Sequence, residues 1–445
     1  MKTAELIILL VGLLVSISTL VLLNRYLKLH AFFCLLIASL ILGIITNISF
    51  AQILTAMQNG FGSLLAQIGF VVALGSCLGV MLEKTGAMHI IAQKILAAFG
   101  KKRSLKAMSA LGLLVGIPVF CDSGFIILSR LIPTIAAQSG VPGSSLALAL
   151  SSGLYTTHSL VPPTPGPLAA AVNLGLAENM GTVILIGILG SIPVGFTGYL
   201  LSKNLGKNFF VHLKEVHPER GHENLSSTKA FLPLVTPIVL ITLATLPKII
   251  GFTGIVAQVL AILGQPFIAL AIGLLLTIPL IRKRDKDWPD WINSALMDAG
   301  IILLITGAGG AFGSVIRESG LESILKGVFS DYKVFGSLFI CFAFMISGLL
   351  KTAQGSTTSA MIITTSLIAP LLAPAGFHNP VHLATIVLAI GSGGMCVSHA
   401  NDSYFWVVSQ FGGIPPDVAL SNFTRITFFQ GLTGLVTAVV IFFLW

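Results

Sequence analysis

Four short polar segments interrupt an otherwise apolar chain, and their side chains could bind a small anion and carry a proton. The first is Gly116-Ile-Pro-Val-Phe-Cys-Asp-Ser-Gly-Phe125, where Asp122 and Ser123 stand between apolar runs. Pro118 and Gly124 break a helix here and free backbone polar groups, which is tolerated at membrane depth only where they line a cavity or pack in protein. A buried carboxyl group favours its neutral form and can therefore exchange a proton. The alternative is that Asp122 caps a helix in water.

The second segment, Thr156-Thr-His-Ser-Leu-Val-Pro-Pro-Thr-Pro-Gly-Pro167, ends in a run of prolines that cannot be regular helix. A half-helix that restarts after this run points its positive N-terminal end at the break, where an anionic group would bind. The candidate substrate ligands at this break are His158, Thr164 and Gly166. An ordinary extracellular loop is the alternative, although apolar runs close in on both sides.

The third segment, Leu350-Lys-Thr-Ala-Gln-Gly-Ser-Thr-Thr-Ser359, carries hydroxyls and an amide in place of a carboxylate. Gln354, Ser356 and Thr357 suit hydrogen bonding to a polyhydroxy ligand or coordination of a cation. Lys351 could pair with a substrate carboxylate, or it could extend to the membrane interface as long basic side chains often do.

The fourth segment, Val397-Ser-His-Ala-Asn-Asp-Ser-Tyr-Phe-Trp406, gathers polar atoms inside an apolar helix. Ser398, His399 and Asn401 are candidate substrate ligands, and Asp402 is a second candidate proton carrier. Polar and ionisable groups at membrane depth are expensive and are retained mostly for function.

An internal repeat relates these segments. Gly79-Val-Met-Leu-Glu-Lys-Thr-Gly86 matches Gly313-Ser-Val-Ile-Arg-Glu-Ser-Gly320, and the run around His158 matches the run around His399. A membrane chain built from two such halves is the usual plan of a secondary transporter, with substrate and coupling ion held where the halves meet. Lone histidines are more often structural, but a pair in mirrored positions favours a functional role.

The composition agrees with a membrane protein. The 445 residues are 55% hydrophobic and 9% charged, whereas a soluble domain carries about 25% charged residues. Apolar runs of about 20 residues, each long enough to cross a bilayer, recur along the chain. The net charge of +9 comes from short loops between these runs and not from a nucleic-acid-binding face. The five cysteines have no metal-type spacing, so we expect neither a metal nor a cofactor.

The loop charges predict the topology. Basic loops are expected in the cytoplasm, and their counterparts in the repeat are nearly neutral or uncharged, which places equivalent loops on opposite sides of the membrane. The two halves are therefore predicted to be inverted. The basic segments are 25–28, 101–106, 203–229 and 282–286, and the counterparts of 101–106 and 282–286 are 331–333 and 47–52.

The predicted fold is an all-α polytopic membrane protein with two inverted repeats, 1–202 and 231–445, joined by a cytoplasmic linker at 203–230. Each repeat has about five transmembrane helices, one of them broken, and a re-entrant hairpin. The predicted helices lie near 5–23, 30–47, 61–82, 181–202, 231–250, 255–281, 299–316 and 421–444, the amphipathic segments near 87–99 and 321–329, the hairpins near 107–138 and 335–373, and the broken helices near 144–176 and 382–411.

With these residues in view, the chain resembles the gluconate permease (GntP) family of bacterial symporters, within the broad ion-transporter superfamily. The resemblance is carried by His158 with Val161-Pro-Pro-Thr-Pro-Gly-Pro167, by Ala353-Gln-Gly-Ser356, and by Ser398-His-Ala-Asn-Asp402 ahead of Phe405-Trp406. It implies proton-coupled uptake of sugar acids and related small hydroxy or amino acids through the bacterial inner membrane. The superfamily implies a homodimer with a fixed scaffold and an elevator-like domain that holds the hairpins and broken helices.

Three positions depart from the family pattern. Asp122, preceded by Cys121, replaces a glutamate preceded by phenylalanine; Thr164 replaces a histidine in the proline-rich run; and Lys351 replaces an arginine. A shorter acid, a missing imidazole and a donor less suited to bidentate pairing all fall at the predicted site. A smaller hydroxy acid such as glycerate is therefore as credible a substrate as gluconate.

The sequence thus predicts import of a small sugar acid or hydroxy acid by proton symport through an elevator-type mechanism. A sodium-coupled or exchange carrier for a small amino acid or other organic anion is the alternative. An intramembrane enzyme is disfavoured because no nucleophile or metal set is present, and a channel has no need of mirrored re-entrant hairpins. The expected partners are the substrate, the coupling proton, the lipid bilayer and a second copy of the chain.

Overall fold

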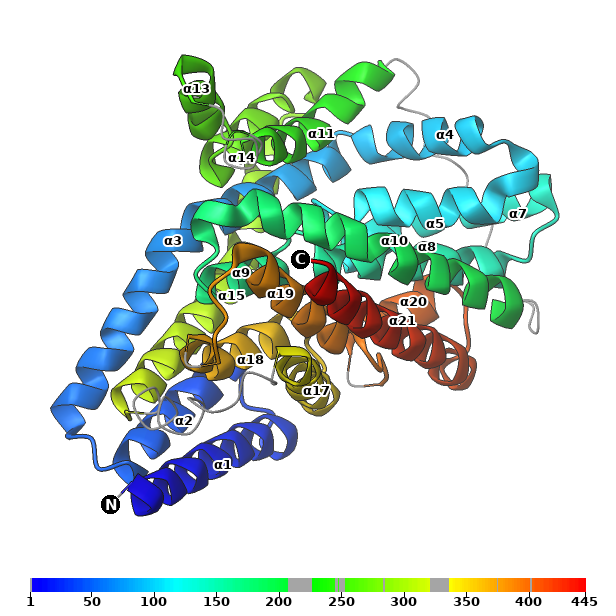
Figure 1. The fold of residues 1–445 in the computed structure, drawn as a ribbon. Helices are drawn as coiled ribbons and strands as arrows, with labels where there is room; N and C mark the ends of the chain where they lie inside the picture. The colour runs from blue at the N-terminus through cyan, green and yellow to red at the C-terminus, as the bar shows by residue number, and fades with distance from the viewer. Residues whose placement is uncertain are drawn as a thin grey trace.

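The computed structural model describes residues 2–206, 226–244, 247, 253–282, 285–320, 336–373, 375–400 and 402–445, and the regular elements in these ranges are all helices (Figure 1). Most of the predicted linker 203–230, the predicted amphipathic segment 321–329 and the candidate ligand Asn401 lie outside the described residues. Six described helices are long and apolar enough to cross a membrane, or seven spans if one bent helix pair is counted as a span.

The longest described helix, α3 (Phe50–Lys84), packs along α15 (Trp288–Glu318). The helices approach closely because a Cβ added at Gly60 would overlap the carbonyl oxygen of Gly310, and one at Gly310 would overlap that of Gly60. Figure 1 shows α1 (Lys2–Tyr26) and α2 (Ala31–Ile45) at one end of α3.

Helix α3 begins well before its predicted start near residue 61. Ser49 accepts a hydrogen bond from the backbone N–H of Gln52, whose side chain binds back to the N–H of Ser49. This capping box satisfies backbone donors at the helix start, so the helix extends through polar residues that made the segment look less like a membrane span.

The prediction of a single helix near 255–281 is wrong. It is divided into α13 (Ile255–Leu263) and α14 (Pro266–Leu275), with a bend of 68° between the two parts. Pro266 lies in the first turn of α14; since proline has no backbone N–H, it fits a helix start but not the interior. Helix α14 packs against α3 and against α11 (Ser227–Leu243).

The structure confirms the predicted interruptions in both hairpins and both broken helices. The breaks fall between α5 (Ser104–Val115) and α6 (Cys121–Ser129), between α8 (Gly143–Leu160) and α9 (Pro165–Asn173), between α17 (Gly336–Gln354) and α18 (Thr357–Leu372), and between α19 (Pro380–Met395) and α20 (Ser403–Phe411). The predicted amphipathic segment 87–99 is confirmed as a helix, α4 (Ala87–Phe99). The other elements are α7 (Ile132–Ser139), α10 (Met180–Leu205), α21 (Pro416–Leu444) and three short 3-10 helices, Lys101–Arg103, Ala177–Asn179 and Ile278–Leu280.

The interrupted helices form one packed body with α10 and α21. Helix α8 packs against α5, α10 and α19, and α21 packs against α10 and α19 (Figure 1). The pair α3 and α15 borders this body, because α9 contacts α3 and α18 contacts α15. The breaks therefore lie within the protein, where freed backbone groups can find partners.

Candidate substrate and proton site

A buried ion pair joins the third and fourth polar segments. Nζ of Lys351, in the last turn of α17, lies 2.6 Å from Oδ2 of Asp402, and the two side chains are 0% and 5% exposed. Lys351 also donates a hydrogen bond of 2.9 Å to the carbonyl oxygen of Gly355. The alternative that Lys351 extends to the membrane interface is therefore wrong.

The carboxylate of Asp402 has further partners from its own segment. The hydroxyl of Ser398 donates to Oδ2 at 2.5 Å, and the backbone N–H of Tyr404 donates to Oδ1 at 3.1 Å. The second bond caps the N-terminus of α20. Both oxygens thus accept hydrogen bonds, which offsets much of the cost of burying the charge.

Tyr155 connects this pair to α8 and α18. Its hydroxyl lies 2.7 Å from Oγ1 of Thr357 and 3.3 Å from Oδ2 of Asp402, and its ring lies 5.8 Å from Nζ of Lys351. Thr357 Oγ1 in turn lies 2.9 Å from the carbonyl oxygen of Gly394. A hydroxyl has one proton, so Tyr155 donates either to Thr357 or to Asp402 at a given moment.

The first polar segment adjoins the fourth. Asp122 is the second residue of α6, whose N-cap is Phe120, so the alternative that Asp122 caps this helix is wrong. The Asp122 carboxylate is half-buried, accepts a 3.5 Å contact from the Cys121 thiol, and lies within range of the charges of Asp402 and Lys351. Ser123 is half-buried in the same turn. Helix α6 packs on α20, where the rings of Phe125 and Tyr404 are 6.3 Å apart.

The second segment is buried and is not an extracellular loop. His158 lies in the last turn of α8 with its ring 5.9 Å from that of Phe120, and among the described residues its Nδ1 has no hydrogen-bond partner. Thr164 occupies the N-cap position of α9, and its hydroxyl donates to the carbonyl of Val161 at 2.6 Å. A Cβ at Gly166 would lie 2.9 Å from the sulfur of Met361, so the start of α9 lies directly against α18.

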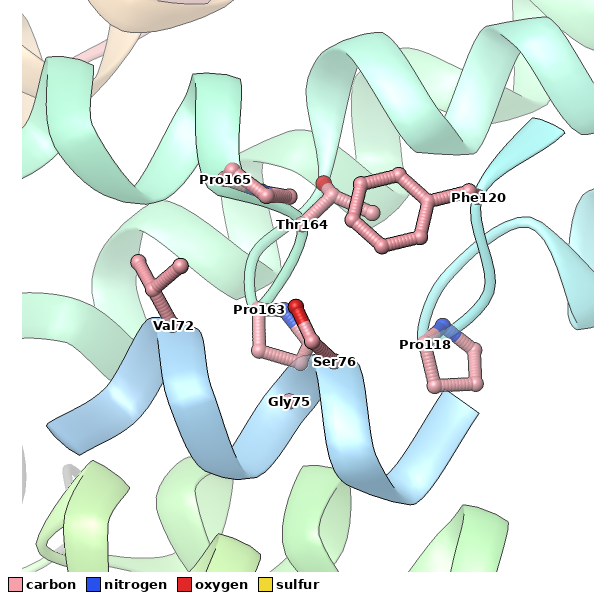
Figure 2. Close-up of a pocket in the computed structure, with 8 residues that line it drawn as sticks. All are labelled: Val72, Gly75, Ser76, Pro118, Phe120, Pro163, Thr164 and Pro165. Carbon is pink, nitrogen blue, oxygen red and sulfur yellow. The ribbon is translucent and has the colours of Figure 1, made fainter. Parts of the chain in front are cut away.

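A small pocket opens between the first two breaks and α3 (Figure 2). Its cavity volume is about 10 Å³, which is room for one water-sized group. Thr164 is the one lining residue that the sequence singled out as a ligand. The lining residues are Val72, Gly75, Ser76, Pro118, Phe120, Pro163, Thr164 and Pro165.

The remaining predicted ligands have mixed surroundings. Gln354 ends α17, and both polar atoms of its side chain are buried without a partner in the described part of the chain. The Ser356 hydroxyl accepts from the N–H of Ser359 and so caps α18. His399 is half-buried, and no described contact joins it to His158. In the same break Val397 adopts φ of 57°, a strained conformation for a β-branched residue of the kind found at functional sites.

Sequence reasoning missed the two buried tyrosines. Tyr155 immediately precedes the Thr-Thr-His run, and Tyr404 stands two residues after Asp402, where its hydroxyl donates to the carbonyl of Ser151 at 2.9 Å. Their positions beside polar segments are the signal that could have identified them. Among the described residues, no group of three or more histidine, cysteine, aspartate or glutamate side chains is placed to hold a metal ion.

Interrupted membrane helices whose ends meet inside the protein are typical of secondary transporters. The chain belongs to the GntP family: the family's profile, described as GntP family permease, matches residues 8–444. This confirms the resemblance seen in the sequence and places the chain among membrane transporters and not among enzymes.

Three relatives span nearly the whole chain. An uncharacterized permease of Haemophilus influenzae is 34% identical over 91% of this chain and 86% of the relative. The inner membrane permease YgbN of Escherichia coli is 32% identical, covering 92% of each chain. The gluconate permease of Pseudomonas aeruginosa is 30% identical, covering 96% of each. The chain is thus a homologue of an inner membrane permease with several membrane-spanning helices, as predicted.

A solved structure shares the fold. The YdaH transporter of Alcanivorax borkumensis superposes with a TM-score of 0.63 at 14% sequence identity, covering 89% of this chain and 88% of that one. The chain therefore shares the all-helical fold of that structure.

Proposed function

We propose that this chain imports a small sugar acid or hydroxy acid, gluconate-like or glycerate-like, together with a proton across the bacterial inner membrane. Family membership and the name of the Pseudomonas relative support the substrate class. The single observation that carries the coupling is the buried pair of Lys351 and Asp402, which holds one cation and one titratable carboxylate at the junction of the helix breaks.

The pair explains how an anion and a proton bind together. When Asp402 takes up a proton, it no longer neutralises Lys351, and the lysine becomes available to the carboxylate of the substrate. Leaving either member of a buried pair uncompensated costs about 3–5 kcal/mol. The anion alone would have to displace a charged Asp402, and the proton alone would leave Lys351 unpaired, so joint binding is favoured.

The substrate would also contact groups that have spare hydrogen-bonding capacity. Gln354 and His158 each carry buried polar atoms without a described partner, and Thr357 lies between Tyr155 and the carbonyl of Gly394. Ser123, Thr164, Gly166, Ser356, Ser398 and His399 lie at the same four breaks and complete the described candidate ligands. Asp122 is the second candidate proton carrier.

The proposed transport cycle is of the elevator type. The body that contains the interrupted helices would move against a scaffold that includes α3 and α15, carrying the ion pair and the substrate with it. The two inverted halves, 1–202 and 231–445, supply the two equivalent orientations that alternating access needs. A homodimer would hold the scaffold in place through the membrane.

Transport by purified protein in proteoliposomes tests the proposal. Adding gluconate or glycerate outside should make the medium more alkaline, and a protonophore should abolish accumulation of the substrate in sodium-free buffer. Uptake that ignores the protonophore and requires sodium would favour the sodium-coupled alternative. Uptake that needs only a substrate on the opposite side would favour exchange, and a panel that includes small amino acids distinguishes the substrate class.

A further inference from the structure

The hydroxyl of Ser76 has no hydrogen-bond partner although its environment is closed. Ser76 lies about two turns before the end of α3 and is 4% exposed, and among the described residues nothing pairs with its Oγ. A buried polar group without a partner costs about 1–3 kcal/mol. Serine hydroxyls in helices usually donate to the carbonyl four residues earlier, as Thr85 does to Met81 on the same helix.

The orphan hydroxyl lines the small pocket. Figure 2 shows Ser76 projecting from α3 toward the two breaks, between Pro118 on one side and Pro163 on the other. Gly75 leaves the helix surface open beside it, because a Cβ there would reach only the carbonyl oxygen of Pro163, at 3.8 Å. The hydroxyl therefore faces a small space that admits one water-sized group.

The chemistry of the lining indicates which part of a ligand fits. None of the lining residues is charged, so a carboxylate has no counter-ion here. Phe120 and the prolines present apolar C–H and ring surfaces. The Ser76 hydroxyl can both donate and accept a hydrogen bond, and the Thr164 oxygen, whose proton is donated to the Val161 carbonyl, can still accept one. Such a surface, with room for one water-sized group, suits a single hydroxyl.

The pocket adjoins the ion pair through two connections. Phe120 lines the pocket and contacts His158, which lies within range of the charges of Lys351 and Asp402. Thr164 lines it and caps α9, whose Gly166 faces Thr358, the residue after Thr357.

We infer that this pocket binds the terminal hydroxyl group of the substrate and that Ser76 determines the preference for a hydroxylated over a deoxy acid. The inference rests on the proposed transport of a small hydroxy acid. Ser76 belongs to α3, which is part of the proposed scaffold and not one of the interrupted helices. The hydrogen bond from Ser76 would therefore connect the scaffold to the substrate.

Matched ligand pairs test the assignment. Glycerate and lactate differ by one terminal hydroxyl, as do gluconate and 6-deoxygluconate. Apparent dissociation constants for all four acids would be measured by thermal stabilisation of the detergent-purified protein, in the wild type, Ser76→Ala, Ser76→Thr and Ser63→Ala. Ser63 is the control because it lies on the exposed side of α3 and donates to the carbonyl of Gly60.

The wild type should prefer the hydroxylated member of a pair. Ser76→Ala should reduce that preference by about three- to tenfold, the value of one hydrogen bond, by weakening the hydroxylated ligand and leaving the deoxy ligand unchanged. Ser76→Thr should retain part of the preference, and Ser63→Ala all of it. The unliganded Ser76→Ala protein should melt no lower than the wild type, because no described hydrogen bond is lost.

Three results overturn the inference. An undiminished preference in Ser76→Ala, with the wild type discriminating as expected, removes Ser76 from the site while the proposed function stands. If both members of each pair stabilise the wild type equally, the pocket does not select the terminal hydroxyl, while the proposed function still stands. A wild type that binds none of the four acids contradicts the proposed substrate class itself, and the inference with it.

Discussion

At the scale of single residues, the pair of Lys351 and Asp402 has a structural role in addition to the functional role proposed for it. Each charge is buried and depends on the other, since Lys351 has one further acceptor in Gly355 and Asp402 has Ser398 and the N–H of Tyr404. Pairs of this kind are poor contributors to net stability, but breaking one is strongly destabilising. Substitutions can therefore separate the effect of the pair on folding stability from its proposed effect on proton coupling.

Single substitutions of the pair should cost more stability than the double substitution. We expect Lys351→Met or Asp402→Ala alone to destabilise the protein by about 3–5 kcal/mol, because the remaining charge is left unpaired in the protein. The double variant should recover most of the loss and still fail to transport. Melting temperatures of the three variants in detergent provide the measurement, and a double variant less stable than both singles would contradict this account of the pair.

The two aspartates should separate proton coupling from substrate movement. Asp402→Asn keeps the shape and the capping oxygen but loses the charge, so it should stop accumulation against a gradient and still permit counterflow of labelled substrate. Asp122→Asn is the matched comparison. If Asp122→Asn abolishes accumulation while Asp402→Asn does not, Asp122 carries the proton.

Tyr155 should matter more than Tyr404 for transport. Tyr155→Phe removes the hydroxyl that contacts Asp402 and Thr357, whereas Tyr404→Phe removes a bond to the Ser151 carbonyl, outside the ion pair. We expect Tyr155→Phe to weaken apparent substrate affinity by about three- to tenfold, and Tyr404→Phe to leave it within twofold. Equal effects on the half-saturation concentration would reduce Tyr155 to a packing role.

The sequence identified much of this site but not its connections. Asp122, Lys351, Thr357 and Asp402 stand out because polar groups in apolar runs are rare. Which of them meet is decided by long-range packing, as in the contact between Tyr155 and Thr357, and no local pattern encodes it. Ser76 gave no signal either, because a lone serine in a membrane helix usually binds its own backbone.

At the scale of elements, proline and glycine explain both the successes and the errors. The proline run at 162–167 predicted a broken helix, and α8 and α9 are separated there. Gly264-Gln265-Pro266 carries a similar signal, and the single span predicted there is two helices. An uninterrupted apolar run can still contain a bend. Hydropathy indicates whether a segment prefers lipid, but it gives no information on the direction of the backbone.

The crossing of α3 and α15 provides an element-scale prediction. Gly60→Ala would drive a methyl group into the backbone of Gly310 and should separate the two helices, whereas a Cβ at Gly62 would meet nothing within 4 Å. We expect Gly60→Ala to lower the melting temperature markedly. Gly62→Ala should leave it unchanged or raise it, because alanine favours helix over glycine by about 1 kcal/mol. Equal melting temperatures would show that the crossing tolerates separation.

At the scale of the whole molecule, the inverted arrangement can be tested by labelling. In a background without the native cysteines, Lys102→Cys and Lys286→Cys should react with a membrane-impermeant maleimide only from the cytoplasmic side. Asn47→Cys, in the loop that the repeat pairs with 282–286, should react only from outside. Labelling of Asn47→Cys and Lys286→Cys from the same side would contradict the inverted arrangement.

The proposed coupling through the ion pair also predicts how transport responds to voltage. Empty, the site holds one ammonium and one carboxylate; loaded as proposed, it holds the ammonium, a neutral Asp402 and the carboxylate of a monovalent substrate. The moving body therefore has the same net charge in both directions. A membrane potential supplies about 2.3 kcal/mol per charge for each 100 mV, but it does no work on a step that moves no net charge. Accumulation should follow the pH difference across the membrane, and a potassium diffusion potential set with valinomycin should leave it unchanged.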